Sequence, residues 1–137
     1  MHIVNRKTFC IRSINRMKKL LLLIVTLLCT TVAFAQSSSI SCIKEKNGYY
    51  CLYNSNGRQY TQISNDRLSL VGYSSRLIVF KKDGYYFIYN ADAKKIATLD
   101  VEHIGTITRV ADDSFISQKK GFTYKWNSTG SKSKIID

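Results

Sequence analysis

The sequence predicts an all-β fold, an antiparallel meander of three repeated units, each about 36 residues long. The first observation is a repeated sequence motif in which a turn glycine precedes a run of strand-forming aromatic residues. Its three copies are Asn47–Asn54, Asp83–Asn90 and Lys120–Asn127. Their glycines lie 36 and 37 residues apart, a period typical of repeat architectures. The second observation is that no stretch after residue 36 has a helical periodicity of useful length.

We expect one domain over residues 36–137, with units at about 38–75, 76–112 and 113–137. Such units would build a curled or propeller-like sheet. The alternative is a β-trefoil or a small closed barrel, in which closure removes the unpaired sheet edges. We favour the open meander because the units are short for a trefoil.

The middle unit shows the expected elements in order. Leu77–Lys81 is a strand, and a turn at residues 82–84 leads into a returning strand, Tyr85–Asn90. Ile96–Leu99 runs back, and Ile104–Val110 supplies a fourth strand. The turn needs a residue in the left-handed conformation to match the twist of the hairpin, and glycine adopts it without steric cost.

Alternate residues of the strand after each glycine point to opposite faces. One face is apolar or aromatic in all three units, and we predict that it is the core side. Its members are Tyr49, Cys51, Tyr53, Tyr85, Phe87, Tyr89, Phe122, Tyr124 and Trp126. The other face carries Thr123 and Lys125 in the third unit. We therefore expect the outer face of this unit to be exposed to solvent, which is typical of a terminal repeat.

The N-terminal third predicts export. A basic segment at residues 17–19 precedes the apolar run Leu20–Leu28, and Ala33-Phe34-Ala35 is a cleavage motif. We interpret residues 17–35 as a signal peptide and residues 1–16 as an upstream extension of the reading frame; the alternative is one long basic region. The apolar run is too short for a permanent anchor, so we expect a periplasmic or secreted protein without a transmembrane segment.

Cleavage after Ala35 would leave 102 residues, enough for one small domain. Six of the 21 basic residues and none of the nine acidic residues precede residue 36, so the mature chain has 15 basic and nine acidic residues, a net charge of +6. This excess is compatible with an anionic partner. Nucleic-acid binding would need a clustered basic stripe or a known motif, and we expect none.

Two cysteines, Cys42 and Cys51, follow the predicted signal, and an exported chain meets an oxidising compartment. A four-residue loop, Glu45–Gly48, would place them directly opposite each other, and we predict a disulfide that staples this hairpin. A three-residue loop would offset them by one residue. The remaining alternative is two buried free thiols that act as small apolar side chains.

The order of turn glycine, aromatic strand, asparagine and second turn resembles the WG-repeat family of secreted and cell-envelope proteins. The nearest match is Lys46-Asn47-Gly48 followed by Asn54–Arg58. The resemblance implies an all-β, meander-like repeat used for binding, with no catalytic residues to carry over. In place of the Trp and Gly that name the family, the three units have Tyr50 and Cys51, Tyr86 and Phe87, and Thr123 and Tyr124.

One cluster could support catalysis. Asp100 and Glu102 would share a strand face beside His103, which places an acid pair next to a base. The alternative function is therefore a small secreted hydrolase that uses these three residues. The first unit has a polar turn at the same place, so we favour a solvated loop. One histidine and two cysteines cannot make a zinc site, and we expect neither a metal nor another cofactor.

Binding has more candidate residues. Lys46, Lys82 and Lys119 occupy the same point of the three hairpins, and stacked units would align them as a row of positive charge. Tyr50 and Tyr86 lie nearby and could stack on sugar rings or aromatic side chains. Alternatively, the lysines keep sheet edges soluble and the tyrosines are packing residues.

The sequence thus predicts a small exported β-repeat protein that binds an envelope protein or polysaccharide without catalysis. An uncovered sheet edge would also allow self-association.

Overall fold

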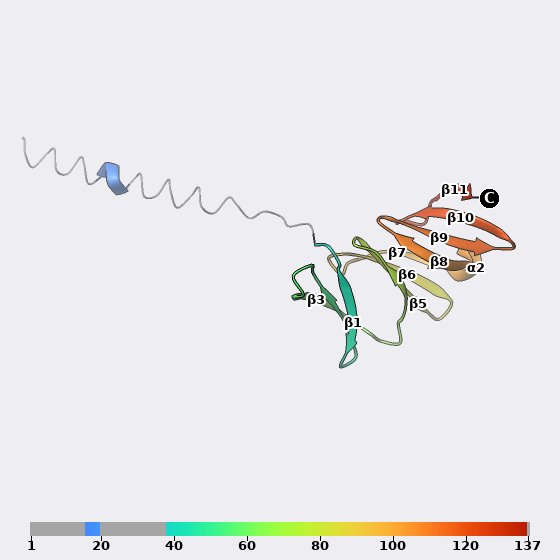
Figure 1. Cartoon of the computed structure of the whole chain (residues 1–137), viewed down its shortest axis with the longest axis horizontal. Helices are drawn as coiled ribbons and strands as arrows, with labels where there is room; N and C mark the ends of the chain where they lie inside the picture. The colour runs from blue at the N-terminus through green and yellow to red at the C-terminus, as the bar shows by residue number, and fades with distance from the viewer. Residues whose placement is uncertain (1–15, 20–37, 137) are drawn as a thin grey trace, which may run out of the picture. The chain divides into compact units, whose positions relative to one another are not determined.

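The computed structural model describes residues 16–19 and 38–136 (Figure 1). Residues 16–19 are helical, whereas the rest of the predicted upstream extension and signal peptide lies outside the described residues. The chain divides into two compact units, Met1–Gln36 and Ser37–Asp137. Within the described part of the chain, no helix combines the length and the apolar character needed to span a membrane.

The second unit contains eleven strands and one short helix (Figure 1). They are β1 (Cys42–Lys46), β2 (Tyr49–Tyr53), β3 (Gln59–Ser64), β4 (Ser69–Tyr73), β5 (Leu77–Lys82), β6 (Tyr85–Asn90), β7 (Lys95–Asp100), α2 (Val101–Ile104), β8 (Thr106–Ala111), β9 (Ser114–Lys119), β10 (Phe122–Asn127) and β11 (Lys132–Ile136). The predicted all-β class is confirmed.

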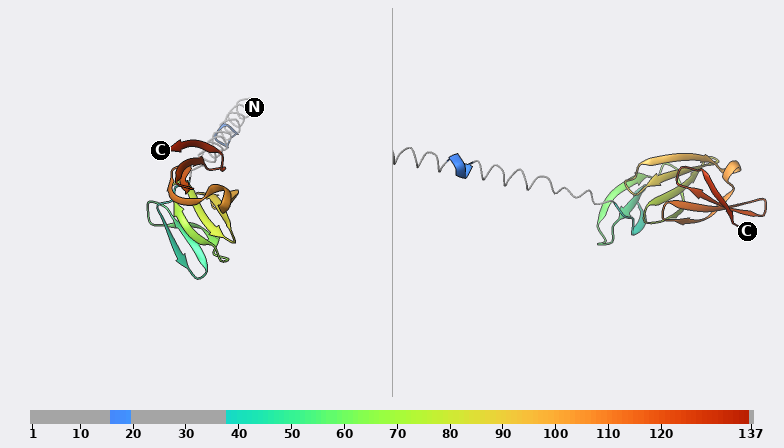
Figure 2. Two further views of the ribbon diagram at one scale, coloured as in Figure 1. Left: turned by 90° about the vertical axis from the view of Figure 1, so that its right-hand side faces the viewer. Right: turned by 90° about the horizontal axis from the view of Figure 1, so that it is seen from above.

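Neighbouring strands along the chain pair with each other and form three open antiparallel sheets. The first sheet has the order β1-β2-β3, the middle sheet β4-β5-β6-β7, and the third sheet β8-β9-β10-β11. The expectation that Ile104–Val110 is the fourth strand of the middle unit is wrong, because β8 pairs with β9 and the middle sheet takes β4 instead. The succession of the three sheets from one end of the domain to the other is visible in Figures 1 and 2. None of the three sheets closes on itself, so the alternative of a closed barrel or trefoil is wrong.

The turn before each aromatic strand has two residues and one geometry. Values of φ are 53° and 78° at Asn47-Gly48, 50° and 83° at Asp83-Gly84, and 50° and 82° at Lys120-Gly121. Positive φ at both central residues is what type I′ hairpin turns require, and their twist matches that of the strands. The predicted left-handed conformation of these glycines is confirmed.

The turn after each aromatic strand also has one form. The Oδ1 atoms of Asn54, Asn90 and Asn127 each accept hydrogen bonds from the backbone N–H groups two and four residues further on, at 2.9–3.1 Å. The third residue after each asparagine is left-handed: Gly57, Ala93 and Gly130. Asparagine side chains brace turns in this way, which gives their recurrence a local structural cause.

Two hydrophobic clusters hold the three sheets together, because side chains of the middle sheet alternate between its two faces. The first cluster, between the first and middle sheets, contains Ile40, Tyr50, Leu52, Ile63, Ile78, Phe80 and Ala91. The second cluster, between the middle and third sheets, contains Leu77, Val79, Tyr86, Ile88, Ile104, Ile107, Phe115 and Trp126. All these residues lie between positions 40 and 126, so the domain has a core of its own.

The predicted core face is only part of the buried surface of β2 and β6. On that face Cys51 is 4% exposed, and Phe87 and Tyr89 pack against the first cluster. The most buried side chains of the two strands include Tyr50, Leu52, Tyr86 and Ile88, each at most 6% exposed, which lie on the opposite face. The predicted face does enter the core in β10, through Trp126. Stacking explains the difference, because β2 and β6 turn their opposite faces toward the next sheet along the chain. In β10 that face meets no further sheet of the described chain, and Lys125 is exposed there, as expected for the terminal unit.

Candidate ligand-binding site

Each of the three turn lysines lines a pocket of its own. Lys46 is exposed and lines a pocket of about 280 Å³ with Tyr49 and Cys51. Lys82 and Lys119 lie at the corresponding ends of β5 and β9. Their pockets differ in size and lining, so the three lysines occupy distinct environments.

Lys82 is paired within its own pocket. Its Nζ donates a hydrogen bond to Asp66 Oδ2 at 3.0 Å. This hydrogen bond and the charge of Lys82 hold the pKa of Asp66 below its usual range. We name the surrounding cavity of about 270 Å³ the β6 pocket; it is lined by Ile63, Ser64, Asp66, Leu68, Lys82, Phe87, Tyr89 and Lys95.

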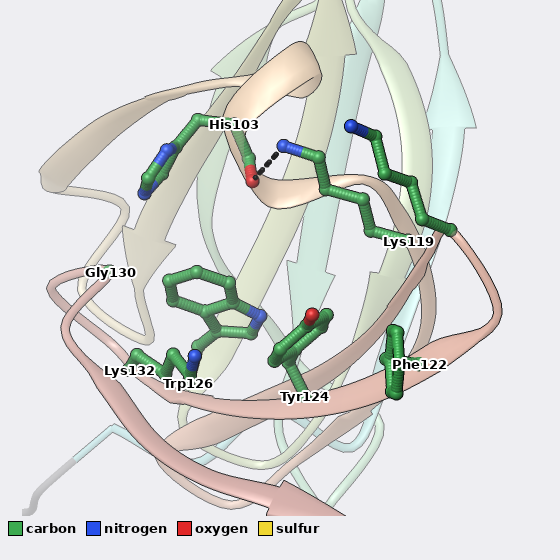
Figure 3. Close-up of a pocket in the computed structure, with 8 residues that line it drawn as sticks. His103, Lys119, Phe122, Tyr124, Trp126, Gly130 and Lys132 are labelled. Atoms are coloured by element: carbon green, nitrogen blue, oxygen red, sulfur yellow. Dashed lines mark hydrogen bonds between the residues drawn. The ribbon is translucent and has the colours of Figure 1, made fainter.

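Lys119 contributes to a larger pocket of about 400 Å³ on the third sheet (Figure 3). Its Nζ donates to the backbone carbonyl of His103 at 3.1 Å. We name this cavity the β10 pocket; it is lined by His103, Lys119, Lys120, Phe122, Tyr124, Trp126, Gly130 and Lys132. Figure 3 shows His103 and Lys119 on one side and the three aromatic side chains of β10 across from them.

The aromatic wall of the β10 pocket is fixed at one end and open at the other. Trp126 is 4% exposed, and its Nε1 donates to Ser117 Oγ at 2.8 Å. Ser117 is fully buried and donates in turn to the Ile104 carbonyl at 2.7 Å. The ring centroids of Tyr124 and Trp126 are 6.1 Å apart, and the Phe122 side chain is 53% exposed. The wall is therefore a preorganised apolar surface that reaches solvent at Phe122.

Lysines supply the charge of the β10 pocket. Lys132 Nζ lies 4.7 Å from the centroid of the Tyr124 ring, a cation–π distance. Lys119 and Lys120 come from the end of β9 and the following turn. None of the eight lining residues is acidic. A concave surface with charges of one sign attracts oppositely charged ligands, and the aromatic wall adds a face for a flat ring.

Tyr50 and Tyr86, predicted as stacking residues, are buried in the clusters instead. Tyr50 donates its hydroxyl hydrogen to the Leu68 carbonyl at 2.8 Å. Tyr86 donates to the Gly105 carbonyl at 3.0 Å, and its oxygen accepts from the N–H of Ile107 at 3.3 Å. Both tyrosines tie down the connection to the next sheet, so their rings offer no face to a ligand.

The predicted disulfide between Cys42 and Cys51 is wrong. The hairpin closes through the two residues Asn47-Gly48 and not through four, so Cys42 lies opposite Tyr53 and Cys51 opposite Lys44. The two cysteines are thus offset by two residues, and both thiols are free. Cys51 is 4% exposed and behaves as a small apolar side chain.

The three residues of the alternative catalytic cluster do not share a strand face. The strand β7 ends at Asp100, and the helix α2 begins at the next residue. Asp100 Oδ1 accepts a hydrogen bond from the Glu102 N–H at 2.7 Å, which makes it the N-cap of α2. Glu102 and His103 are exposed. Within residues 16–19 and 38–136, no group of three acidic, histidine or cysteine side chains is placed to hold a metal ion.

Sequence reasoning missed most of the β10 pocket. It assigned Phe122, Tyr124 and Trp126 to the core, placed Lys120 only beside the row of turn lysines, and overlooked Lys132. A signal was present, because four lysines surround the alternating aromatic residues between positions 119 and 132. The stacking of the sheets decides how much of the aromatic face of a strand is buried, and this stacking cannot be inferred from the sequence of one unit alone.

Comparisons with models of protein families, with curated proteins and with solved structures gave no match to this chain. Conclusions about its function rest on the residues described above.

Proposed function

We propose that this chain is a small exported protein that binds a protein or polysaccharide of the cell envelope and catalyses no reaction. The observation that carries the proposal is the β10 pocket, in which a fixed aromatic wall faces lysine side chains with no acidic residue among them. Pockets with an apolar lining and a few converging polar groups are typical binding sites.

The proposal includes a three-unit repeat of the WG-like kind in a propeller-like arrangement. Three observations support it: the shared type I′ turns, the shared asparagine turns, and the tyrosine–carbonyl bonds of Tyr50 and Tyr86 at corresponding positions. Repeats of this kind stack their units and use the resulting surface for binding. Export is supported by the sequence of residues 17–35, and the mature charge of +6 favours an anionic partner.

The test is sedimentation of the mature domain, residues 36–137, with envelope and secreted fractions of its source organism. The pocket variant combines Phe122→Ala with Tyr124→Leu, because leucine keeps apolar bulk against the second cluster. The matched control combines Tyr49→Ala with Tyr85→Ala, since these side chains are 41% and 47% exposed and occupy the place of Phe122 in the other hairpins.

We expect the wild type and the control to sediment with the envelope fraction at low salt, and the pocket variant to remain in the supernatant. High salt should weaken binding by screening the lysines. Circular dichroism would verify that the variants keep the fold. Equal retention of the pocket variant and the control, or no retention of the wild type, would refute the proposal.

A further inference from the structure

We infer that the β10 pocket binds the uronic acid units of an acidic polysaccharide, with the sugar ring on the aromatic wall and the carboxylate on the lysines. This inference rests on the proposed function and names its ligand class. It comes from a comparison of the β10 pocket with the β6 pocket.

The two pockets are built from residues at the same places of two hairpins. Lys82 and Lys119 end the strand before the turn, opposite Tyr85 and Phe122 respectively. Phe87 and Tyr124 each lie three residues after the turn glycine. A lysine at the start of the next strand completes each pocket: Lys95 pairs with Tyr89, and Lys132 pairs with Trp126.

The β6 pocket contains a carboxylate of the protein itself. Asp66, from the connection between the first and middle sheets, places its Oδ2 3.0 Å from Lys82 Nζ. The same pocket contains an aromatic residue with a lysine over it, since Lys95 Nζ lies 5.4 Å from the centroid of the Phe87 ring. The shared arrangement of turn lysine, aromatic strand residue and second lysine, which we call the hairpin frame, therefore accommodates a carboxylate that bonds the turn lysine beside an aromatic ring.

The β10 pocket repeats the frame without the carboxylate. The connection between the middle and third sheets contains α2 and has no counterpart of Asp66. This helix presents the His103 carbonyl and ring to the β10 pocket. Lys119 donates to that neutral carbonyl, and Lys120 and Lys132 add two further positive charges. A charged acceptor makes a stronger hydrogen bond with an ammonium group than a neutral carbonyl does, so a ligand carboxylate can replace this contact.

The aromatic wall indicates that the ligand contains a sugar ring. A pyranose has an apolar C–H face that packs on an aromatic side chain, as other flat apolar surfaces do. A uronic acid carries one carboxylate beside that face, which matches a wall of aromatic rings opposite lysines. Phe122 and Tyr124 are two residues apart on one strand face, about 7 Å along the strand. With Phe122 exposed, the wall can take consecutive rings of a chain that extends into solvent.

The test uses the fluorescence of Trp126, the single tryptophan of the chain, to follow binding to the mature domain. The probes are a galacturonate oligomer, the methyl ester of that oligomer, polyglutamate and oligothymidylate. The ester keeps the ring and removes the charge, whereas polyglutamate keeps the carboxylates and removes the ring. Oligothymidylate tests for a single-stranded nucleic acid, which also combines stacking with negative charge.

We expect saturable binding of the galacturonate oligomer, at least about tenfold tighter than that of the other three probes. Tyr124→Leu should weaken binding about tenfold, since loss of one stacking partner typically costs that much. Lys132→Gln lies outside the clusters and should weaken binding about fivefold, with a smaller salt dependence. The matched control is Lys44→Gln, since Lys44 Nζ lies 5.3 Å from the centroid of the Tyr53 ring on the first sheet; this variant should bind like the wild type.

Equal affinity for the ester, polyglutamate or oligothymidylate would overturn the inference, as would unchanged binding by both pocket variants. Absence of galacturonate binding would also overturn it. If the envelope fraction still retains the wild type and not the pocket variant, only the ligand class fails. If the envelope fraction retains the pocket variant as well, the proposed function fails with it.

Discussion

The two interfaces between neighbouring sheets use the same frame but differ in the connection that crosses them. Between the first and middle sheets, the chain passes through residues 65–68, where Asp66 pairs with Lys82. Between the middle and third sheets it passes through α2 and Gly105, and no acidic side chain lines the adjacent pocket. The comparison shows that a short connection, and not the strands, decides whether the turn lysine of a pocket meets a carboxylate or a neutral backbone carbonyl.

The largest expected effect tests whether the two interfaces form one folding unit. Phe80 in the first cluster and Phe115 in the second are both fully buried. Phe80→Ala and Phe115→Ala should each lower the free energy of unfolding by about 3–5 kcal/mol through lost burial and a residual cavity. Urea unfolding followed by circular dichroism should show a single transition for each variant. Two separated transitions in either variant would show that the interfaces unfold independently.

The second effect concerns the connection at the second interface. Gly105 has φ 85° and ψ −158°, a conformation essentially restricted to glycine, and a Cβ there would overlap the backbone carbonyl of Gln118. Gly105→Ala should therefore lower the free energy of unfolding by about 3 kcal/mol.

The control for Gly105 is a left-handed glycine with free space around it. Gly57 has φ 71°, and a Cβ at this position would meet no atom within 4 Å. Gly57→Ala should cost about 1 kcal/mol, the strain of a left-handed alanine alone. Equal losses at the two positions would contradict the close approach of Gly105 to β9.

A third effect compares the tyrosines that anchor the two connections. Tyr86→Phe would deprive two backbone groups of their partner, and one of them belongs to the buried Ile107. Tyr50→Phe would free only the carbonyl of Leu68, which is half-buried. We expect a loss of about 2 kcal/mol for Tyr86→Phe and about 1 kcal/mol for Tyr50→Phe by chemical denaturation. The reverse order would show that the first connection is held more tightly.

The smallest effect is the pH dependence due to Asp66. Lys82 lowers the pKa of Asp66 in the folded state. The contribution of Asp66 to stability is therefore present above its unfolded-state pKa, about 3.9, and is lost as pH falls through the lower folded pKa. Asp66→Asn should be slightly less stable than the wild type at neutral pH and equal to it below both pKa values. A difference that persists in strong acid would point to a cause other than this ion pair.

The all-β class and the turns could be predicted because they depend on local chemistry. Gly48, Gly84 and Gly121 sit where the hairpin twist requires positive φ, and the asparagines at the second turn bond within their own loops. The disulfide prediction failed because the cysteine offset depends on turn length, and the type I′ turn at Asn47-Gly48 uses two residues.

The site could not be predicted in the same way, because it depends on contacts between sheets. Tyr89 and Trp126 occupy the same place on β6 and β10, yet Tyr89 is half-buried and Trp126 is 4% exposed. Which face is covered follows from the direction in which the sheets stack. The sequence also gives no local sign that α2 replaces the connection that holds Asp66, since the residues around His103 resemble a polar turn.

The most direct test of the account is a map of where a ligand binds the mature domain. Backbone amide shifts of the isotope-labelled domain would be recorded by nuclear magnetic resonance during titration with the galacturonate oligomer. We predict that the shifts concentrate at His103 and between Lys119 and Lys132, on the third sheet. Shifts that concentrate around Asp66 and Lys82, or that spread evenly over the exposed lysines, would contradict the assignment of the β10 pocket as the binding site.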